Sequence, residues 1–275
     1  MSAFRTVVPR SEGDVAEVLA RVVARAEHAL LIGGGTLTVP ALVRGDVLPS
    51  IVVDLGRAGM DRIEVQSDAI RIGALVCYQQ LLDCESVRVR LPLLHRLCSG
   101  ITGGIQIRNQ GTLVGALCAA RPQSDGPAAL VALGAEVVVR SSGGSRVVGA
   151  AEFLRGAEDP DLRPDEFVTA IRIPFQNTGS GYVKVKFAES SWPVLTAAAV
   201  SSGHVVIGGV ADVPQRIPLP DVHHGAVRGE VAEHLDRIPV AQRWSDLRAD
   251  WDYRRRVAPE VAARAVGLAL QEGGS

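Results

Sequence analysis

The sequence contains two glycine-rich segments whose residue types suit the binding of an anionic group. Gly33-Gly34-Gly35-Thr36 directly follows the apolar run at residues 29–32, and a second segment occupies residues 111–116. Glycines at the end of a strand allow φ > 0 and a close approach of the backbone to a ligand. Bare N–H groups can then point at one anion, usually a phosphate. Two such segments together predict a site for a nucleotide cofactor.

A dinucleotide-binding fingerprint is present only in part. Asp54 ends an expected strand about 20 residues after the glycines, where a ribose-binding acid would stand. However, Thr38 occupies the third glycine position, and Pro40 would lie inside the helix that should begin there. NAD binding is therefore a minor alternative.

Side chains that could carry catalysis by themselves are scarce. The six histidines are scattered, and His223-His224 are interpreted as a solvated loop pair without nearby carboxylates or thiols. The four cysteines show no C-x-x-C spacing and are expected to be buried free thiols. We therefore expect no metal site and assign no catalytic residue. If the chain is an enzyme, a cofactor should carry the chemistry.

The composition is that of an ordinary globular protein. Of the 275 residues, 47% are hydrophobic and 21% charged, and the formal net charge is −1. This balance gives no reason to expect nucleic acid or an anionic membrane as a partner. No apolar run reaches the ~18 residues of a transmembrane helix, and no signal-peptide pattern is visible. We therefore expect a cytoplasmic protein that does not enter a membrane.

Hydrophobic periodicity predicts an α+β fold. A helix should begin at Ser11 and present an apolar face of Val15, Val18, Leu19, Val22 and Val23. The following segments are expected to be strands: 30–32, 51–55, 69–75, 135–140 and 167–173. Helices are expected within 81–97 and at 127–133, with a hairpin turn at 141–145. Residues 99–125, rich in Gly, Thr, Asn and Gln, are expected to be irregular and functional.

A linker at residues 176–181 is expected to separate a smaller C-terminal part. Beyond it the alternation predicts strands at 182–187, 194–200 and 205–210, and helices at 227–235 and 259–270. The run Arg254-Arg255-Arg256 is interpreted as a solvated helix face. The expected division is a domain at 1–175, with subdomains of about 1–56 and 57–175, and a domain at 182–275.

The glycine-rich segments resemble those of the FAD-binding medium subunit family of molybdenum hydroxylases, which includes carbon monoxide dehydrogenase medium chains and the flavin domain of xanthine dehydrogenase. Residues 31–36, Leu-Ile-Gly-Gly-Gly-Thr, are similar to the first pyrophosphate loop. Residues 106–116 are similar to the second, usually I-R-N-x-G-T-I-G-G-N. Pro122-Gln123-Ser124-Asp125 matches the P-x-x-D that follows. Further similarity at 166–174, 207–210 and 253–255 extends the resemblance over nearly the whole chain.

The resemblance implies a two-subdomain FAD-binding domain of the PCMH type, which is vanillyl-alcohol-oxidase-like, followed by a small α+β C-terminal domain. It implies that two loops of N–H groups bind the pyrophosphate of FAD. It also implies that Asp125 bonds a ribose or ribityl hydroxyl, that Val168 contacts the cofactor and that Lys186 lies near the flavin. The implied cofactor-binding residues are Ile32, Gly33, Gly34, Gly35, Thr36, Leu37, Thr102, Gly111, Thr112, Gly115, Ala116, Asp125, Val168 and Lys186.

Several positions depart from the family pattern. Val114 replaces a glycine, and its branched Cβ is expected to oppose a backbone with φ > 0. Ala116 replaces an asparagine, Leu37 an aspartate, and Arg121 a small serine. Residues 188–193 are shorter than the family's arginine-rich stretch. The sequence leaves open how tightly FAD binds.

Two functions of different class follow from the resemblance. In the first, the chain receives electrons from a 2Fe–2S small subunit, which itself receives them from a molybdenum large subunit. The chain then passes the electrons to an external acceptor such as NAD, a quinone or oxygen. In the alternative, it is a stand-alone flavoprotein oxidase or dehydrogenase of a small molecule, or a flavin-free binding or scaffold protein. Neither substrate nor acceptor nor oligomeric state follows from the sequence.

Overall fold

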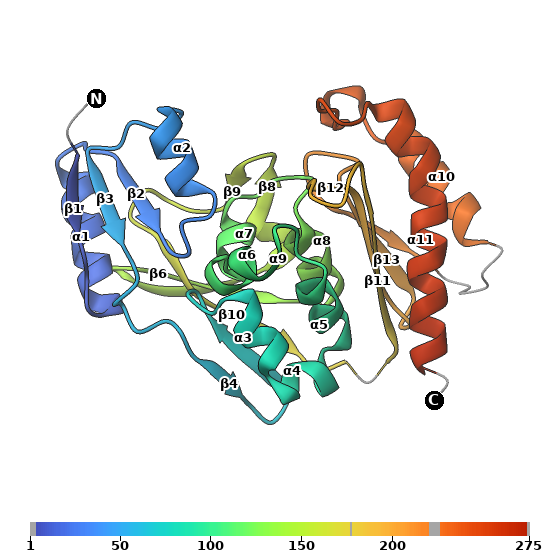
Figure 1. Cartoon of the computed structure of the whole chain (residues 1–275), viewed down its shortest axis with the longest axis horizontal. Coiled ribbons are helices and arrows are strands. Elements are labelled where there is room, and N and C mark those ends of the chain that lie inside the picture. The colour runs from blue at the N-terminus through green and yellow to red at the C-terminus, as the bar shows by residue number, and fades with distance from the viewer. Residues whose placement is uncertain (1–3, 177, 220–225, 274–275) are drawn as a thin grey trace.

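The computed structural model describes residues 4–176, 178–219 and 226–273. The chain folds into three main sheets that follow one another along its longest dimension (Figure 1). They are built from strands within residues 5–54, 63–174 and 180–218. Helices occur along the chain together with both parallel and antiparallel strands, so the α+β expectation is confirmed. The division into separate domains stays a prediction.

The first sheet is parallel and has the order β1-β3-β2, with β1 at Arg5–Val7, β2 at Ala29–Ile32 and β3 at Ile51–Asp54. Helices α1 (Glu12–Ala24) and α2 (Thr38–Arg44) connect the strands. Ser11 caps α1 as predicted, because its Oγ accepts a hydrogen bond from the Asp14 N–H at 3.1 Å. Val15, Val18, Leu19 and Val22 are buried, whereas Val23 is exposed.

The second sheet is antiparallel and has the order β4-β5-β10-β6-β7. Its strands are β4 (Ile63–Val65), β5 (Ala69–Gly73), β6 (Glu136–Ser141), β7 (Gly144–Gly149) and β10 (Phe167–Pro174). The pairing of Ser141 with Gly144 confirms the predicted hairpin turn. Helix α9 (Ala150–Phe153) and the small pair β8 (Leu154–Gly156) and β9 (Asp159–Pro160) precede β10.

A group of short helices connects β5 to β6 and packs with this sheet in one apolar core. The helices are α3 (Tyr78–Asp83), α4 (Glu85–Arg90), α5 (Pro92–Ser99), α6 (Gly104–Gln110), α7 (Leu113–Cys118) and α8 (Asp125–Ala132). The expectation that residues 99–125 are irregular is therefore wrong. Helix α6 buries none of its residues, and α7 has only six, so neither is long enough to display a helical hydrophobic period.

The third sheet is an antiparallel meander of β11 (Ser180–Lys186), β12 (Pro193–Val200), β13 (His204–Gly208) and β14 (Gln215–Pro218). Helix α8 packs on one of its faces, and the long helix α11 (Trp251–Gly273) packs on the other (Figure 1). Every residue of β12 is consequently buried. Ala198 belongs to the core of the second sheet, whereas Ala197 and Ala199 belong to a separate core beneath α11 and α10 (Val227–Asp236).

Helix α11 begins at Trp251, so the predicted start at Pro259 is wrong and Pro259 lies inside the helix. The earlier start carries Arg254 into the core, where its guanidinium donates to the carbonyls of Val194 and Gly209 and pairs with Asp246 at 2.8 Å. Arg254 is fully buried, so the interpretation of the arginine run as a solvated face is wrong for this residue. The 3₁₀ turn η1 (Val240–Gln242) precedes α11, and the pair His223-His224 lies outside the described residues.

A buried carboxylate fixes the segment that leads into β10. Arg146 on β7 donates to both oxygens of Glu166 at 2.9 Å, and the Arg163 backbone N–H donates to Oε2 at 2.9 Å. These hydrogen bonds, from Arg146 above all, lower the pKa of Glu166 to about 2. At pH values between about 2 and 4.5, Glu166 therefore stays charged in the folded protein, whereas the same side chain in the unfolded chain already binds a proton.

We predict that this carboxylate makes the folding free energy depend on pH between 4.5 and about 2. Because its pKa is lower in the folded state, its contribution is complete above 4.5 and is lost as the pH falls towards 2. Glu166→Gln should lower the free energy of unfolding by about 2–3 kcal/mol at neutral pH and flatten the slope in that interval. Urea unfolding at several pH values measures both. Glu17→Gln, at an exposed position of α1, should leave the slope as it is.

Candidate functional site

The two glycine-rich segments meet in space. A Cβ atom placed on Gly34 would lie only 1.7 Å from the carbonyl oxygen of Gln110, and one on Gly33 would lie 4.0 Å from Oγ1 of Thr112. The backbone that begins the second segment therefore lies directly against the first. Gly34 has no allowed replacement at this separation without movement of one of the two backbones.

A cavity of about 340 Å³ opens where these segments meet, within the range of small-molecule sites. Most residues implied by the resemblance line it: Gly33, Gly34, Gly35, Thr36, Leu37, Thr102, Gly111, Thr112, Gly115, Ala116 and Asp125. Ile32, Val168 and Lys186 are not among the lining residues. The cavity is further lined by Leu31, Thr38, Tyr78, Ile101, Ile107, Cys118, Ala119, Ser124, Trp192 and Pro193. The role of each residue towards a cofactor stays a prediction.

Thr112 caps the short helix α7 at the cavity wall. Its Oγ1 accepts a hydrogen bond from the Gly115 N–H at 3.0 Å. The N–H groups of Leu113 and Val114 are first-turn donors, which have no partner inside a helix. Neither Leu113 nor Val114 lines the cavity, whereas Thr112 does, so the Thr112 hydroxyl proton is the donor that this end of α7 offers at the wall.

Asp125, the first residue of α8, is the buried carboxylate of the cavity. Its Oδ1 accepts a hydrogen bond from the Tyr182 hydroxyl at 2.7 Å and an ion-paired one from Lys184 Nζ at 2.6 Å. Lys184 Nζ also donates to the Gly100 carbonyl at 2.6 Å. Both hydrogen bonds from these partners reach the same oxygen, Oδ1.

The sequence interpretation missed Tyr182 and Lys184 and selected Lys186 from the same strand. Residues 182, 184 and 186 alternate along β11, so the side-chain alternation made Lys184 as strong a candidate for the site as Lys186. In the structure Lys186 Nζ donates to the Glu189 carbonyl, within its own loop. Burial, together with the charge of Asp125, raises the pKa of Tyr182 well above its ordinary value. Tyr182 is therefore a neutral donor to Asp125.

Comparison with known proteins identifies the family. Residues 2–176 match the family model described as FAD binding domain in molybdopterin dehydrogenase. The chain is 34% identical to the glyceraldehyde dehydrogenase medium chain of Sulfolobus acidocaldarius, over 85% of this chain and 88% of that protein. It is 28% identical to the nicotine 6-hydroxylase medium subunit of Paenarthrobacter nicotinovorans, over 97% of both. The chain belongs to the molybdopterin dehydrogenase FAD-binding family.

A solved structure extends the likeness to the C-terminal part. Carbon monoxide dehydrogenase from Hydrogenophaga pseudoflava superposes with a TM-score of 0.90 at 26% identity, covering 99% of each chain. The suspected family, the α+β FAD-binding fold with its C-terminal α+β part, and FAD as the cofactor are thereby confirmed. The protein is an FAD-dependent oxidoreductase of the medium-subunit type.

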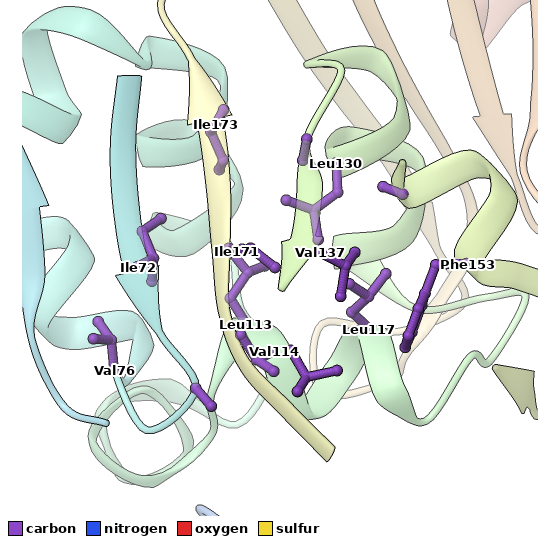
Figure 2. Packing of buried hydrophobic residues seen from close by; sticks show 14 of the residues in the cluster. Ile72, Val76, Leu113, Val114, Leu117, Leu130, Val137, Phe153, Ile171 and Ile173 are labelled. Atoms are coloured by element: carbon purple, nitrogen blue, oxygen red, sulfur yellow. The ribbon is translucent and has the colours of Figure 1, made fainter. Parts of the chain in front are cut away.

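Val114 does not act as the family pattern had suggested. It is the second residue of α7 and is absent from the residues with positive φ, so the expected conflict with a left-handed backbone is wrong. Its side chain is 3% exposed and lies with Leu117 and Ile171 among the apolar side chains of the core (Figure 2). Because the side chain points away from the cavity, Val114 is compatible with a cofactor that lies against the N–H groups of α7.

We predict that Val114→Gly lowers the free energy of unfolding by about 2–4 kcal/mol, from the lost apolar contacts and the poor helix propensity of glycine. The same substitution should not tighten FAD binding, because no strain at this backbone is relieved. Urea unfolding and titration of flavin-free protein with FAD measure the two effects. Val43→Gly, at a position 80% exposed on α2, should cost only about 0.5 kcal/mol. A clear gain in FAD affinity from Val114→Gly would contradict the helical geometry of this segment.

We predict that Gly34→Ala weakens FAD binding about tenfold or more and destabilises the fold by about 1–3 kcal/mol. The reason is the collision of the new Cβ with the Gln110 carbonyl, which forces the two segments apart. Isothermal titration with FAD and urea unfolding give the two values. Gly13→Ala on α1 is the matched control, since its Cβ would meet only Ser11 Oγ at 3.6 Å. That variant should bind FAD normally, and equal affinities for both variants would refute the contact.

The structure also places Asp54 and the four cysteines relative to the cavity. Asp54 accepts a hydrogen bond from the Gly56 N–H at 2.9 Å and does not line the cavity, so it is not placed as a ribose-binding acid. Cys98 is buried as expected, whereas the other three cysteines are half-buried. Burial raises the pKa of Cys118, on the cavity wall, to about 12, so this thiol is protonated.

In the described part of the chain, no group of three or more His, Cys, Asp or Glu side chains could hold a metal ion. No helix there is both long and apolar enough to cross a membrane.

Proposed function

We propose that this chain is the flavin subunit of a molybdenum hydroxylase complex, and that it passes electrons between an iron–sulfur partner and an external acceptor. The observation that carries the proposal is the cavity lined by both glycine-rich segments and by the buried carboxylate of Asp125. FAD is long, with a dianionic pyrophosphate at its centre and hydroxyl groups on either side. The pyrophosphate suits the hydrogen-bond donors of the glycine-rich segments, and a hydroxyl group suits the carboxylate of Asp125.

The pyrophosphate of FAD is proposed to lie between the two glycine-rich segments. Gly33, Gly34 and Gly35 offer backbone N–H groups, and the threonines Thr36 and Thr112 offer hydroxyl protons at the same cavity. Gly35 has φ of 71°, a left-handed conformation that suits glycine and turns the chain around the anion. These contacts bind and orient the cofactor without a charged side chain.

Asp125 is proposed to accept a hydrogen bond from a ribose or ribityl hydroxyl through its carboxylate. Tyr182 and Lys184 fix the carboxylate in a single orientation, which lowers the entropy lost when the ligand binds. When bound, FAD supplies the redox centre that accepts and releases electrons. The protein contributes the orientation of the flavin and the exclusion of water around it.

The partners are inferred from the relatives. The Sulfolobus and Hydrogenophaga proteins are named as medium chains, which indicates larger and smaller chains beside them. A molybdenum large subunit and a 2Fe–2S small subunit are the proposed partners, with a small molecule as substrate or acceptor.

The proposal is tested by co-expression of this chain with the molybdenum and iron–sulfur subunits encoded in the same genome. We expect a complex that co-purifies with bound FAD and whose flavin absorbance bleaches when the substrate of the molybdenum subunit is added. A chain that retains FAD, stays separate from these subunits and reduces its flavin directly with a small molecule would refute the proposal and support the stand-alone alternative. A chain that binds no flavin under any condition would support the scaffold alternative.

We predict that Tyr182→Phe weakens FAD binding about threefold to tenfold, because Asp125 loses one of the two groups that orient it. The free energy of unfolding should fall by about 1.5–3 kcal/mol, the usual loss of a buried hydrogen bond to a charged group. Titration with FAD and urea unfolding measure these effects. Tyr253→Phe on α11, at a position 37% exposed, is the control and should change neither value. Unaltered affinity in Tyr182→Phe would contradict the proposed contribution of Tyr182 to FAD binding through Asp125.

A further inference from the structure

Trp192 forms part of the cavity wall and is covered by an arginine. Trp192 and Pro193 line the cavity at the end of the loop that joins β11 to β12. The guanidinium carbon of Arg121 lies 5.5 Å from the centroid of the Trp192 ring, within the range of a cation–π contact. Arg121 itself does not line the cavity. It therefore supports the indole without being a wall residue itself.

Arg121 is held in turn by the segment around β8 and β9. Its Nε lies 3.3 Å from Oε1 of Glu158, and the Glu158 N–H donates to the Ala120 carbonyl at 2.9 Å. Ala120 and Glu158 both have positive φ, 45° and 58°, which is unfavourable for residues with a Cβ. Such conformations persist where the surrounding structure imposes them. The backbone contact between Ala120 and Glu158 therefore places Glu158 beside Arg121, whose guanidinium lies over the indole.

The main chain on either side of Trp192 is fixed separately. On the preceding side, Thr102 Oγ1 donates to the Ser191 carbonyl at 3.0 Å, and Thr102 is itself a lining residue. On the following side, the buried Arg254 donates to the Val194 carbonyl. These bonds fix the main chain on both sides of Trp192. The Arg121 contact acts on the indole ring itself and therefore bears on the orientation of the ring.

We propose that Arg121 is a positioning residue for cofactor retention. Anchored by Glu158, it holds the Trp192 ring in place at the cavity wall and so slows the release of FAD. The inference rests on the proposed function, because it assigns FAD to this cavity. It concerns Arg121 and Glu158, neither of which touches the cavity.

The test uses the full chain with FAD as the ligand. Arg121→Gln removes the cation, Arg121→Lys keeps a positive charge, and Glu158→Gln removes the anchor. Arg243→Gln is the matched control, because Arg243 lies 4.9 Å from the centroid of the Trp251 ring in the C-terminal part. The first readout is the rate of FAD release after dilution, followed by the rise of free-flavin fluorescence, and the second is acrylamide quenching of Trp192 emission without FAD. The second is measured in a Trp244→Phe, Trp251→Phe background, where Trp192 is the remaining tryptophan.

We expect Arg121→Gln to release FAD about three to ten times faster and to make Trp192 more accessible to acrylamide. Glu158→Gln should act in the same direction with a smaller effect, Arg121→Lys should restore part of the retention, and Arg243→Gln should change neither readout. If Arg121→Gln does not fold, Glu158→Gln and Arg121→Lys decide the matter by the same readouts.

The proposal is overturned if FAD release is unchanged in the Arg121 and Glu158 variants, whether or not quenching rises. It is also overturned if Arg243→Gln accelerates release equally, since the effect would then be a general loss of stability. Normal FAD binding by the unmodified chain in these cases leaves the proposed function intact. Absence of FAD binding by the unmodified chain would overturn both.

Discussion

The flavin cavity depends on one close approach between two backbones, that of Gly34 to the Gln110 carbonyl. The first segment follows a strand of the parallel sheet, and the second begins after α6 and continues into α7, which packs on β10 of the antiparallel sheet. Only glycine permits this separation, and residues of both segments line the same cavity. The contact therefore joins two parts of the chain that have separate sheets into one binding site.

The features that could be predicted from the sequence are those that depend on residues close together in the chain. The cap at Ser11, the glycine segments and the hairpin at residues 141–145 are encoded within a few residues, and the structure has all three. Spacing could not predict α6 or the full extent of α11. The first buries no residue, and the second continues through Pro259, because packing against a sheet outweighs the loss of one helical hydrogen bond.

The site residues that were missed are those whose role comes from tertiary contacts. Lys184 and Lys186 are equivalent by alternation, and only the position of Asp125 on another element distinguishes them. Val114 was misjudged because a family glycine suggested a positive φ, whereas the helical backbone here accepts a branched side chain and uses it in the core. Arg254 was misjudged because a charged run is usually solvated, and its buried carbonyl partners lie far away in sequence.

The C-terminal sheet contributes to the cavity that is proposed to bind FAD. Tyr182 and Lys184 of β11 hold the cavity carboxylate, while Trp192 of the loop before β12 and Pro193, the first residue of β12, contribute to the wall. Because β12 is buried on both faces, this loop is attached to a strand that has little freedom to move. A ligand that binds only this arrangement stabilises it by mass action. With FAD bound in this cavity as proposed, cofactor binding and the docking of the C-terminal sheet are coupled through the contacts of Asp125, although the glycine segments themselves lie in the N-terminal part.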